Sequence, residues 1–304
     1  MDTSVILIFN DFHSQNEIQV NKQFLLRQEL LSNYNWAFKP TKILELHRKI
    51  LNTGIKIKNI DDLFIRRGIL TGYDKAFIIN KNVKNNLIQL DKNNKKIIKP
   101  IVRGRDLKKW KISFENQYLI CTKNEIEVKY EYPTIYDYLK KFEKKLTKRW
   151  DKGHHWSNLR NCTYYDEFER EKIIYPNIAS NLSCVLDNNK YYINPKCYMI
   201  SSKNFNLKYL IAILNSKLMA FTFSLLGSPL GKKGYDLHKQ YIEQLTIVLP
   251  DKSNEKNFDK YVMEILNSTN ENKIKNIENK INQMVYELYN LSEDEIQIIE
   301  KELI

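Results

Sequence analysis

Residues 69–110 constrain the fold most strongly, because their apolar runs are short and are separated by polar turns. Short runs of β-branched and aromatic residues predict strands. We expect three strands here, at residues 76–79, at Ile88 and Leu90, and at Ile97, Ile98 and Ile101. Strands of this length are typical of small sheets. The stretch therefore predicts small twisted sheets joined by polar loops.

The third of these strands leads into a strongly basic segment. Between positions 92 and 111 there are nine Lys or Arg residues against one acid, Asp106. The nine are Lys92, Lys95, Lys96, Lys99, Arg103, Arg105, Lys108, Lys109 and Lys111. Such a surface suits a polyanion, because each neutralised phosphate releases condensed counterions. A solvated basic face would explain the same charges, and charge alone leaves both interpretations open.

Arg103 and Arg105 flank Gly104 within this segment. Because glycine permits a sharp turn, we expect the backbone to present both guanidinium groups outward. An outward guanidinium group can pair with a guanine edge in the major groove of DNA.

The overall charge of +13 also indicates an acidic partner, with nucleic acid first and an anionic membrane surface second. A membrane span is not expected, since no run of 18 apolar residues is present. Residues 1–14 lack the basic start and the cleavage site of a signal peptide. The four cysteines form no CxxC pair, which favours reduced thiols in a cytoplasmic protein.

The rest of the chain predicts a mixture of helices and strands, so the expected fold class is α/β (mixed α+β). Apolar residues at helical spacing predict helices at residues 41–51, 130–150, 205–226 and 253–304. Strands are expected at residues 117–121, 172–176, 183–186, 191–193, 198–200 and 246–249. His154, His155 and Cys162 do not have the spacing of a closed zinc site, so we assign no metal to them.

Several short motifs occur together and in a recognisable order. They are 68–72 with 75–77, 98–100 with 103–106, Trp156 with 159–160, 172–176, 209–210 with 214–217, 241–242, and 285–291 with Glu293 and Glu295. With these motifs the chain resembles the TaqI-like C-terminal specificity domain of Type II adenine-N6 DNA methyltransferases, including enzymes fused to a restriction nuclease. The resemblance covers roughly residues 60–304.

The resemblance implies a target-recognition domain that reads a short duplex DNA sequence. It also implies that an adenine is flipped out of the stack and presented to a catalytic domain on the N-terminal side. On this basis we expect a linker after a missing methyltransferase domain at residues 1–58, the DNA target-recognition domain at 59–250, and a C-terminal helical segment at 251–304. The expected partners are double-stranded DNA and a methyltransferase domain or subunit.

The sequence departs from the complete enzyme in one respect. An adenine-N6 methyltransferase needs an Asn/Asp-Pro-Pro-aromatic loop, and here no two prolines are adjacent. No glycine-rich turn follows an N-terminal strand to hold S-adenosylmethionine. We therefore expect no catalytic residue, cofactor or metal site in this chain, which would be a separated, truncated or split part. S-adenosylmethionine, with Mg²⁺ if a nuclease is present, would belong to the parent enzyme.

The candidate DNA contacts are basic and aromatic residues within these motifs and loops. They are Lys75, Arg103, Arg105, Lys108 and Lys109, followed by Trp156, Arg160, Lys217, Lys232, Lys233 and Tyr235. Packing explains the two aromatic residues equally well. For residues 215–217, a kink or cap inside a buried helix is the favoured interpretation.

Three other functions stay open at this point. Glu127 and Lys129 form an ExK motif, and with Asp106 they could hold Mg²⁺ in a DNA endonuclease. A Type I-like specificity subunit would use the helices after Pro250 to dock methylation subunits. A plain interaction module would carry its basic face only for solubility.

Overall fold

The computed structural model describes residues 3–8, 22–27, 39–231 and 234–303. The chain divides into two compact units. The central unit comprises Asp62–Ile178 and Ser183–Leu207. The terminal unit comprises Met1–Asp61, Ala179–Leu182 and Lys208–Ile304. The segment boundaries expected at 58 and 250 stay a prediction, since residues 208–250 are grouped with the C-terminal helices.

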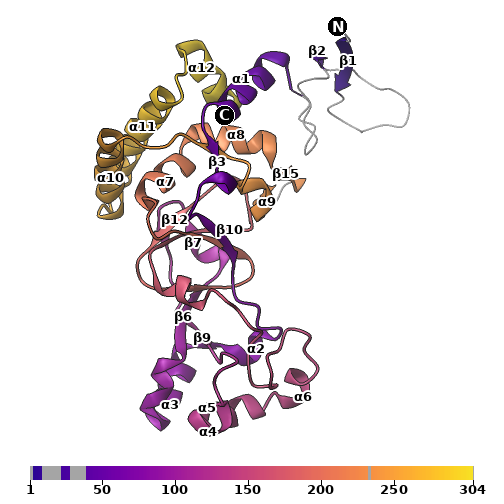
Figure 1. Ribbon diagram of the computed structural model, residues 1–304, viewed down its shortest axis with the longest axis vertical. Coiled ribbons are helices and arrows are strands. Elements are labelled where there is room, and N and C mark those ends of the chain that lie inside the picture. The colour runs from indigo at the N-terminus through magenta and orange to yellow at the C-terminus, as the bar shows by residue number, and fades with distance from the viewer. Residues whose placement is uncertain (1–2, 9–21, 28–38, 232–233, 304) are drawn as a thin grey trace. The chain divides into compact units, whose positions relative to one another are not determined.

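The central unit is built on two four-stranded sheets, shown in Figure 1 around the labels β10 and β6. The first has the order β12 (Val185–Asp187), β10 (Lys172–Pro176), β14 (Cys197–Ser201) and β4 (Phe64–Arg67). The second has the order β13 (Tyr192–Ile193), β6 (Ile98–Val102), β9 (Gln117–Ile120) and β5 (Ile78–Asn80). All neighbours are antiparallel except β13 and β6, which pair in parallel.

A single apolar core joins these sheets. Residues from both contribute, including Ile101, Leu119, Ile174 and Met199, which are fully buried. Short helices and turns complete the unit. They are α2 (Asp74–Phe77), α3 (Lys81–Leu90), η3 (Lys92–Lys96), η4 (Gly104–Asp106), α4 (Val128–Glu131), α5 (Pro133–Lys140), α6 (Glu143–Leu146) and η5 (Tyr165–Glu169), with the hairpin β7 (Leu107–Lys108) and β8 (Lys111–Ile112).

The terminal unit is mainly helical. Its helices are α1 (Thr41–Asn52), α7 (Leu207–Leu214), α8 (Lys217–Leu226), α9 (Lys239–Ile242), α10 (Lys252–Leu266), α11 (Glu271–Leu288) and α12 (Glu293–Glu302). Short strands and turns accompany them, namely β1 (Thr3–Ile8), β2 (Lys22–Arg27), β3 (Ile55–Lys56), η2 (Ile57–Asn59), β11 (Ile178–Ala179), β15 (Ser228–Pro229), β16 (Tyr235–Asp236) and β17 (Thr246–Ile247). The predicted class, a mixed fold with small sheets and a helical C-terminal part, is confirmed.

The closing motif of residues 285–291 has a packing role in this unit. Tyr289 is fully buried, and its hydroxyl donates to the carbonyl of Thr246 at 2.7 Å. The hydroxyl of Tyr286 donates to Glu300 at 2.8 Å, which ties α11 to α12. Asn290 has a φ of 50°, so it ends α11 with a left-handed turn. The motif therefore holds the last helix, α12, in place.

Two strands expected near the start of the central unit are corrected by the structure. Residues 76 and 77 belong to the short helix α2, so β5 begins at Ile78. Ile88 and Leu90 lie in α3, because Asn80 caps that helix by accepting a hydrogen bond from the Val83 amide at 3.0 Å. The cap and the buried Leu87 outweigh the apparent alternation of the two apolar residues.

The long helices expected at 130–150 and 205–226 are both broken. Residues 130–150 form α4, α5 and α6, and the break at Phe142 lets its ring contact Tyr73 and Tyr138. In the second case α7 and α8 are bent by 67°, and Ser216 caps α8 by accepting from the Met219 amide. The cap favoured for residues 215–217 is thus confirmed. Among the described residues, no single helix has the length and apolarity of a membrane span, although this bent pair has them jointly.

Candidate nucleic-acid interface

The β7–β8 hairpin presents the basic segment to solvent. Lys108 pairs with Lys111 across the hairpin, and Trp110 stands at its tip with a φ of 68°. This left-handed conformation turns the indole inward, where it is 8% exposed, and the Trp110 amide donates to the Cys184 carbonyl at 3.1 Å. The buried Trp110 anchors the tip. The neighbouring lysines of the hairpin, Lys108, Lys109 and Lys111, all face solvent.

Arg103 and Arg105 do not behave alike, which corrects the expectation that both are presented. Nε of Arg103 donates to Asp106 Oδ2 at 3.2 Å and its Nη2 donates to Oδ1 at 3.3 Å. The Arg103 amide donates to the same carboxylate at 2.8 Å. The Arg105 side chain is 72% exposed and lies 3.9 Å from Asp106. The one acid of the segment is therefore buried and largely neutralised, and Arg105 faces outward.

The remaining candidates of the central unit have different surroundings. Lys75 is exposed on α2, directly after the turn at Gly72. Trp156 is partly buried, with its ring 5.2 Å from Tyr136 between centroids. Arg160 is exposed and forms an ion pair with Asp151 at 3.0 Å. Lys75 thus joins the hairpin residues as an exposed cation, whereas Trp156 packs and Arg160 is paired.

The other four candidates belong to the terminal unit. Lys217 forms an ion pair with Glu300, and its amide donates to Asn282 Oδ1 at 2.9 Å. The Tyr235 ring stands edge-on to Phe223, with 6.1 Å between centroids. Lys232 and Lys233 lie outside the described residues. The DNA-binding role of all the candidates stays a prediction.

Arg149 is a structural residue within residues 130–150, where the sequence predicts a single helix. Its guanidinium group is buried and donates to the carbonyls of Thr71, Trp156 at 2.7 Å and Asn158 at 2.9 Å. Further bonds reach the carbonyls of Leu146 and Asp151, both at 3.3 Å. Burial lowers its pKa to about 10, and it stays protonated at neutral pH. No sequence signal separates this arginine from the exposed lysines around it.

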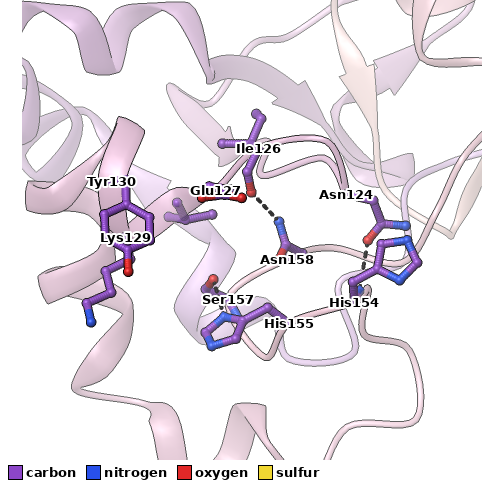
Figure 2. A pocket seen from close by; sticks show the side chains of 10 residues that line it. Asn124, Ile126, Glu127, Lys129, Tyr130, His154, His155, Ser157 and Asn158 are labelled. Atoms are coloured by element: carbon purple, nitrogen blue, oxygen red, sulfur yellow. Dashed lines mark hydrogen bonds between the residues drawn. The ribbon is translucent and has the colours of Figure 1, made fainter.

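A pocket of about 450 Å³ adjoins the loop held by Arg149, and Figure 2 shows its lining. Asn158 Nδ2 donates to the Ile126 carbonyl at 3.0 Å, and the His154 amide donates to Asn124 Oδ1 at 3.0 Å. His155 Nδ1 lies 2.8 Å from the Ser157 hydroxyl. These polar groups are mostly satisfied within the protein itself.

The same pocket contains Glu127 and Lys129 of the ExK motif. Asp106, the other carboxylate considered for a nuclease, does not line it and is held by Arg103. Within residues 39–231 and 234–303, no group of three or more His, Cys, Asp or Glu is placed to hold a metal ion. Asp106 thus does not join Glu127 and Lys129 at this pocket, as the endonuclease alternative would require.

Residues 99–247 match the family model of the TaqI-like C-terminal specificity domain. The Type II methyltransferase M.MjaIV of Methanocaldococcus jannaschii is 27% identical over 154 residues, which are 46% of this chain and 49% of that protein. The Type II methyltransferase M.BstVI of Geobacillus stearothermophilus is 21% identical over 310 residues, covering 99% of this chain and 52% of that protein. This chain thus spans about half the length of these relatives.

Two solved structures share the fold. The Type IIL restriction-modification enzyme MmeI, in complex with DNA, matches with a TM-score of 0.59 and 13% identity, over 80% of this chain and 35% of that chain. The type IIG restriction endonuclease BpuSI matches with a TM-score of 0.50 and 15% identity, over 91% of this chain and 37% of that chain.

Proposed function

Residues 99–247 are a TaqI-like C-terminal specificity domain, and from this premise we propose that the chain recognises a short duplex DNA sequence. It would act as the specificity part of an adenine-N6 DNA methyltransferase or a restriction-modification enzyme. The observation that carries the proposal is the hairpin of Lys108, Lys109 and Lys111 beside the outward Arg105. In that segment the buried Asp106 takes little charge away from the surface.

Each group of this surface has a distinct role in the proposal. The lysines neutralise phosphates, which supplies affinity that depends on salt but not on sequence. Arg105 is exposed and carries a planar fork, so it is the candidate for pairing with a guanine edge. Anchoring of Trp110 in the core reduces the entropy lost when the hairpin binds.

The reaction itself belongs to the catalytic part of the parent enzyme in this proposal. That part would supply the loop that holds the flipped adenine, the site for S-adenosylmethionine, and Mg²⁺ where a nuclease is present. The chain would work in the cytoplasm, next to a methyltransferase domain or subunit. Both relatives are Type II methyltransferases, which supports this assignment.

Selection from a randomised duplex library at about physiological salt, followed by sequencing of the bound fraction, tests the proposal. We expect an enriched short motif. Binding without a motif would mean that specificity needs the catalytic part, and an absence of binding would overturn the proposal.

A matched control separates the hairpin from charge in general. Replacing Lys108, Lys109 and Lys111 by alanine should weaken binding of the selected motif and of random duplex DNA alike. Replacing the exposed Lys252, Lys256 and Lys273 of α10 and α11 removes the same charge elsewhere and should leave both affinities unchanged.

A further inference from the structure

Trp150 is 99% exposed, while Trp110 of the same unit is 8% exposed. A large aromatic side chain in this position gains nothing from the core of the protein. Tryptophan combines a large rigid surface with few rotatable bonds, and it often carries the binding energy where two molecules meet. Its exposure therefore needs a reason outside the fold of the central unit.

The backbone that carries Trp150 is braced on both sides. The preceding residue, Arg149, is tied to five carbonyl groups. After it, Lys152 Nζ donates to the Thr147 carbonyl at 2.8 Å, and Lys152 bridges to Leu159 in antiparallel fashion. The indole thus projects from a rigid support, so binding through it costs little loop-ordering entropy.

The sequence around this indole is strongly basic. Residues 140–160 contain eight Lys or Arg and two acids, Glu143 and Asp151. Asp151 forms an ion pair with Arg160 at 3.0 Å, which removes much of its charge. Lys148 and Lys152 flank the indole in the chain and are both exposed. An apolar plane among positive charges matches a molecule with flat rings and phosphates.

We propose that Trp150 stacks on a nucleobase of the bound DNA, as a positioning residue that holds the duplex where a base is unstacked. This inference rests on the proposed function and assigns it a second contact region, separate in sequence from the β7–β8 hairpin. Every base presents a π-face, so the contact strengthens binding without reading sequence. Aromatic stacking is also compatible with partial unstacking of a base step, which a lysine cannot support.

The first test is affinity for the duplex motif selected above. Because stacking on an aromatic side chain contributes substantially per base, Trp150→Ala should weaken binding roughly 5- to 100-fold. Trp150→Phe should recover most of it, since a ring remains. The slope of affinity against salt should stay the same, because an indole releases no counterions. Tyr130→Ala, which removes another exposed ring from the same unit (74% exposed), should change affinity less than twofold.

The second test reads the indole directly. The emission of Trp150 is obtained as the difference between the unchanged protein and Trp150→Ala. Duplex DNA should quench this emission, whereas inorganic polyphosphate, which has the charges but no bases, should not. Equal quenching by both, or equal DNA affinity of Trp150→Ala and the unchanged chain, would overturn the inference and leave the proposed function standing. A failure of the unchanged chain to bind any DNA would overturn both.

Discussion

The guanidinium group of Arg103 closes on the carboxylate of Asp106 with two hydrogen bonds, at 3.2 and 3.3 Å, and the Asp106 side chain is 1% exposed. Two residues along the chain, Arg105 has the same chemistry and is 72% exposed. This difference in burial separates a residue that holds the turn from one that can reach a ligand.

Arg103→Ala should therefore cost stability, while Arg105→Ala should cost recognition. Loss of Arg103 leaves a buried carboxylate without its main partner, so we expect unfolding to become easier by roughly 2–4 kcal/mol. Arg105→Ala should change stability by less than about 0.5 kcal/mol. Denaturant unfolding of the two variants measures both values, and equal destabilisation would contradict the assignment.

If Arg105 reads a base, its loss should weaken binding to the target more than binding to random DNA, by about 1–3 kcal/mol. Titrations of both duplexes under identical salt measure this difference. An equal loss for the two duplexes would reduce Arg105 to a phosphate clamp.

The hairpin lysines should act through charge alone. Replacing Lys108, Lys109 and Lys111 by alanine should lower the slope of log affinity against log salt by about one for each lysine that contacts a phosphate. Binding measured from low to physiological salt gives the slope. An unchanged slope would show that DNA does not reach this hairpin.

Arg149→Lys should destabilise the protein, although lysine keeps the positive charge. A lysine cannot reach several carbonyls with one planar fork, so buried acceptors lose their donor and stability should fall by more than about 3 kcal/mol. The neighbouring Lys148 is exposed, and Lys148→Ala should be nearly neutral. Thermal unfolding compares the stability of the two variants. An Arg149→Lys variant as stable as the unchanged protein would refute the structural role of Arg149.

His47 in α1 gives the terminal unit a dependence on acid. Burial lowers the pKa of its imidazole to about 4, opposed by a backbone hydrogen bond at Thr222. The unfolded chain takes up this proton near pH 6.5, whereas the folded chain does not. Above that pH the imidazole is neutral in both states and does not reduce the stability of the folded state. Stability should fall as pH drops from 6.5 towards 4, by up to about 3 kcal/mol in total.

The contribution of His47 is isolated by comparison with His47→Gln, whose stability should fall less over the same pH range. The two proteins differ at this position alone, so a difference between their stability curves reports on His47. Parallel stability curves for the two proteins would exclude His47 as the cause.

The cysteines should differ in reactivity. Burial raises the pKa of the Cys121 thiol to about 12 and also raises the pKa of Cys184 and Cys197. Cys162 is partly exposed, so its thiol is the accessible one of the four. At pH 8 a thiol reagent should modify the native protein first at Cys162, and Cys162→Ser should remove this phase. Rapid reaction of all four without denaturant would contradict the burial.

The sequence predicted the features that depend on local pattern. A short run of β-branched and aromatic residues predicted β10 with its bounds, and helical spacing placed α1 within a residue at each end. Motif order predicted the specificity domain, and charge density singled out the segment that carries the β7–β8 hairpin. These features could be predicted because a short stretch of chain contains their cause.

Tertiary structure decided what each side chain contacts. Arg103, Arg105 and Arg149 are chemically identical in the sequence. Only packing places Arg103 against a carboxylate, Arg105 towards solvent and Arg149 against five carbonyls. The breaks at Phe142 and Ser216 followed from ring contacts and a cap that compete with helix continuation. The sequence alone named the candidate DNA contacts. Because burial depends on residues distant in the chain, only the fold decided which of these candidates face solvent.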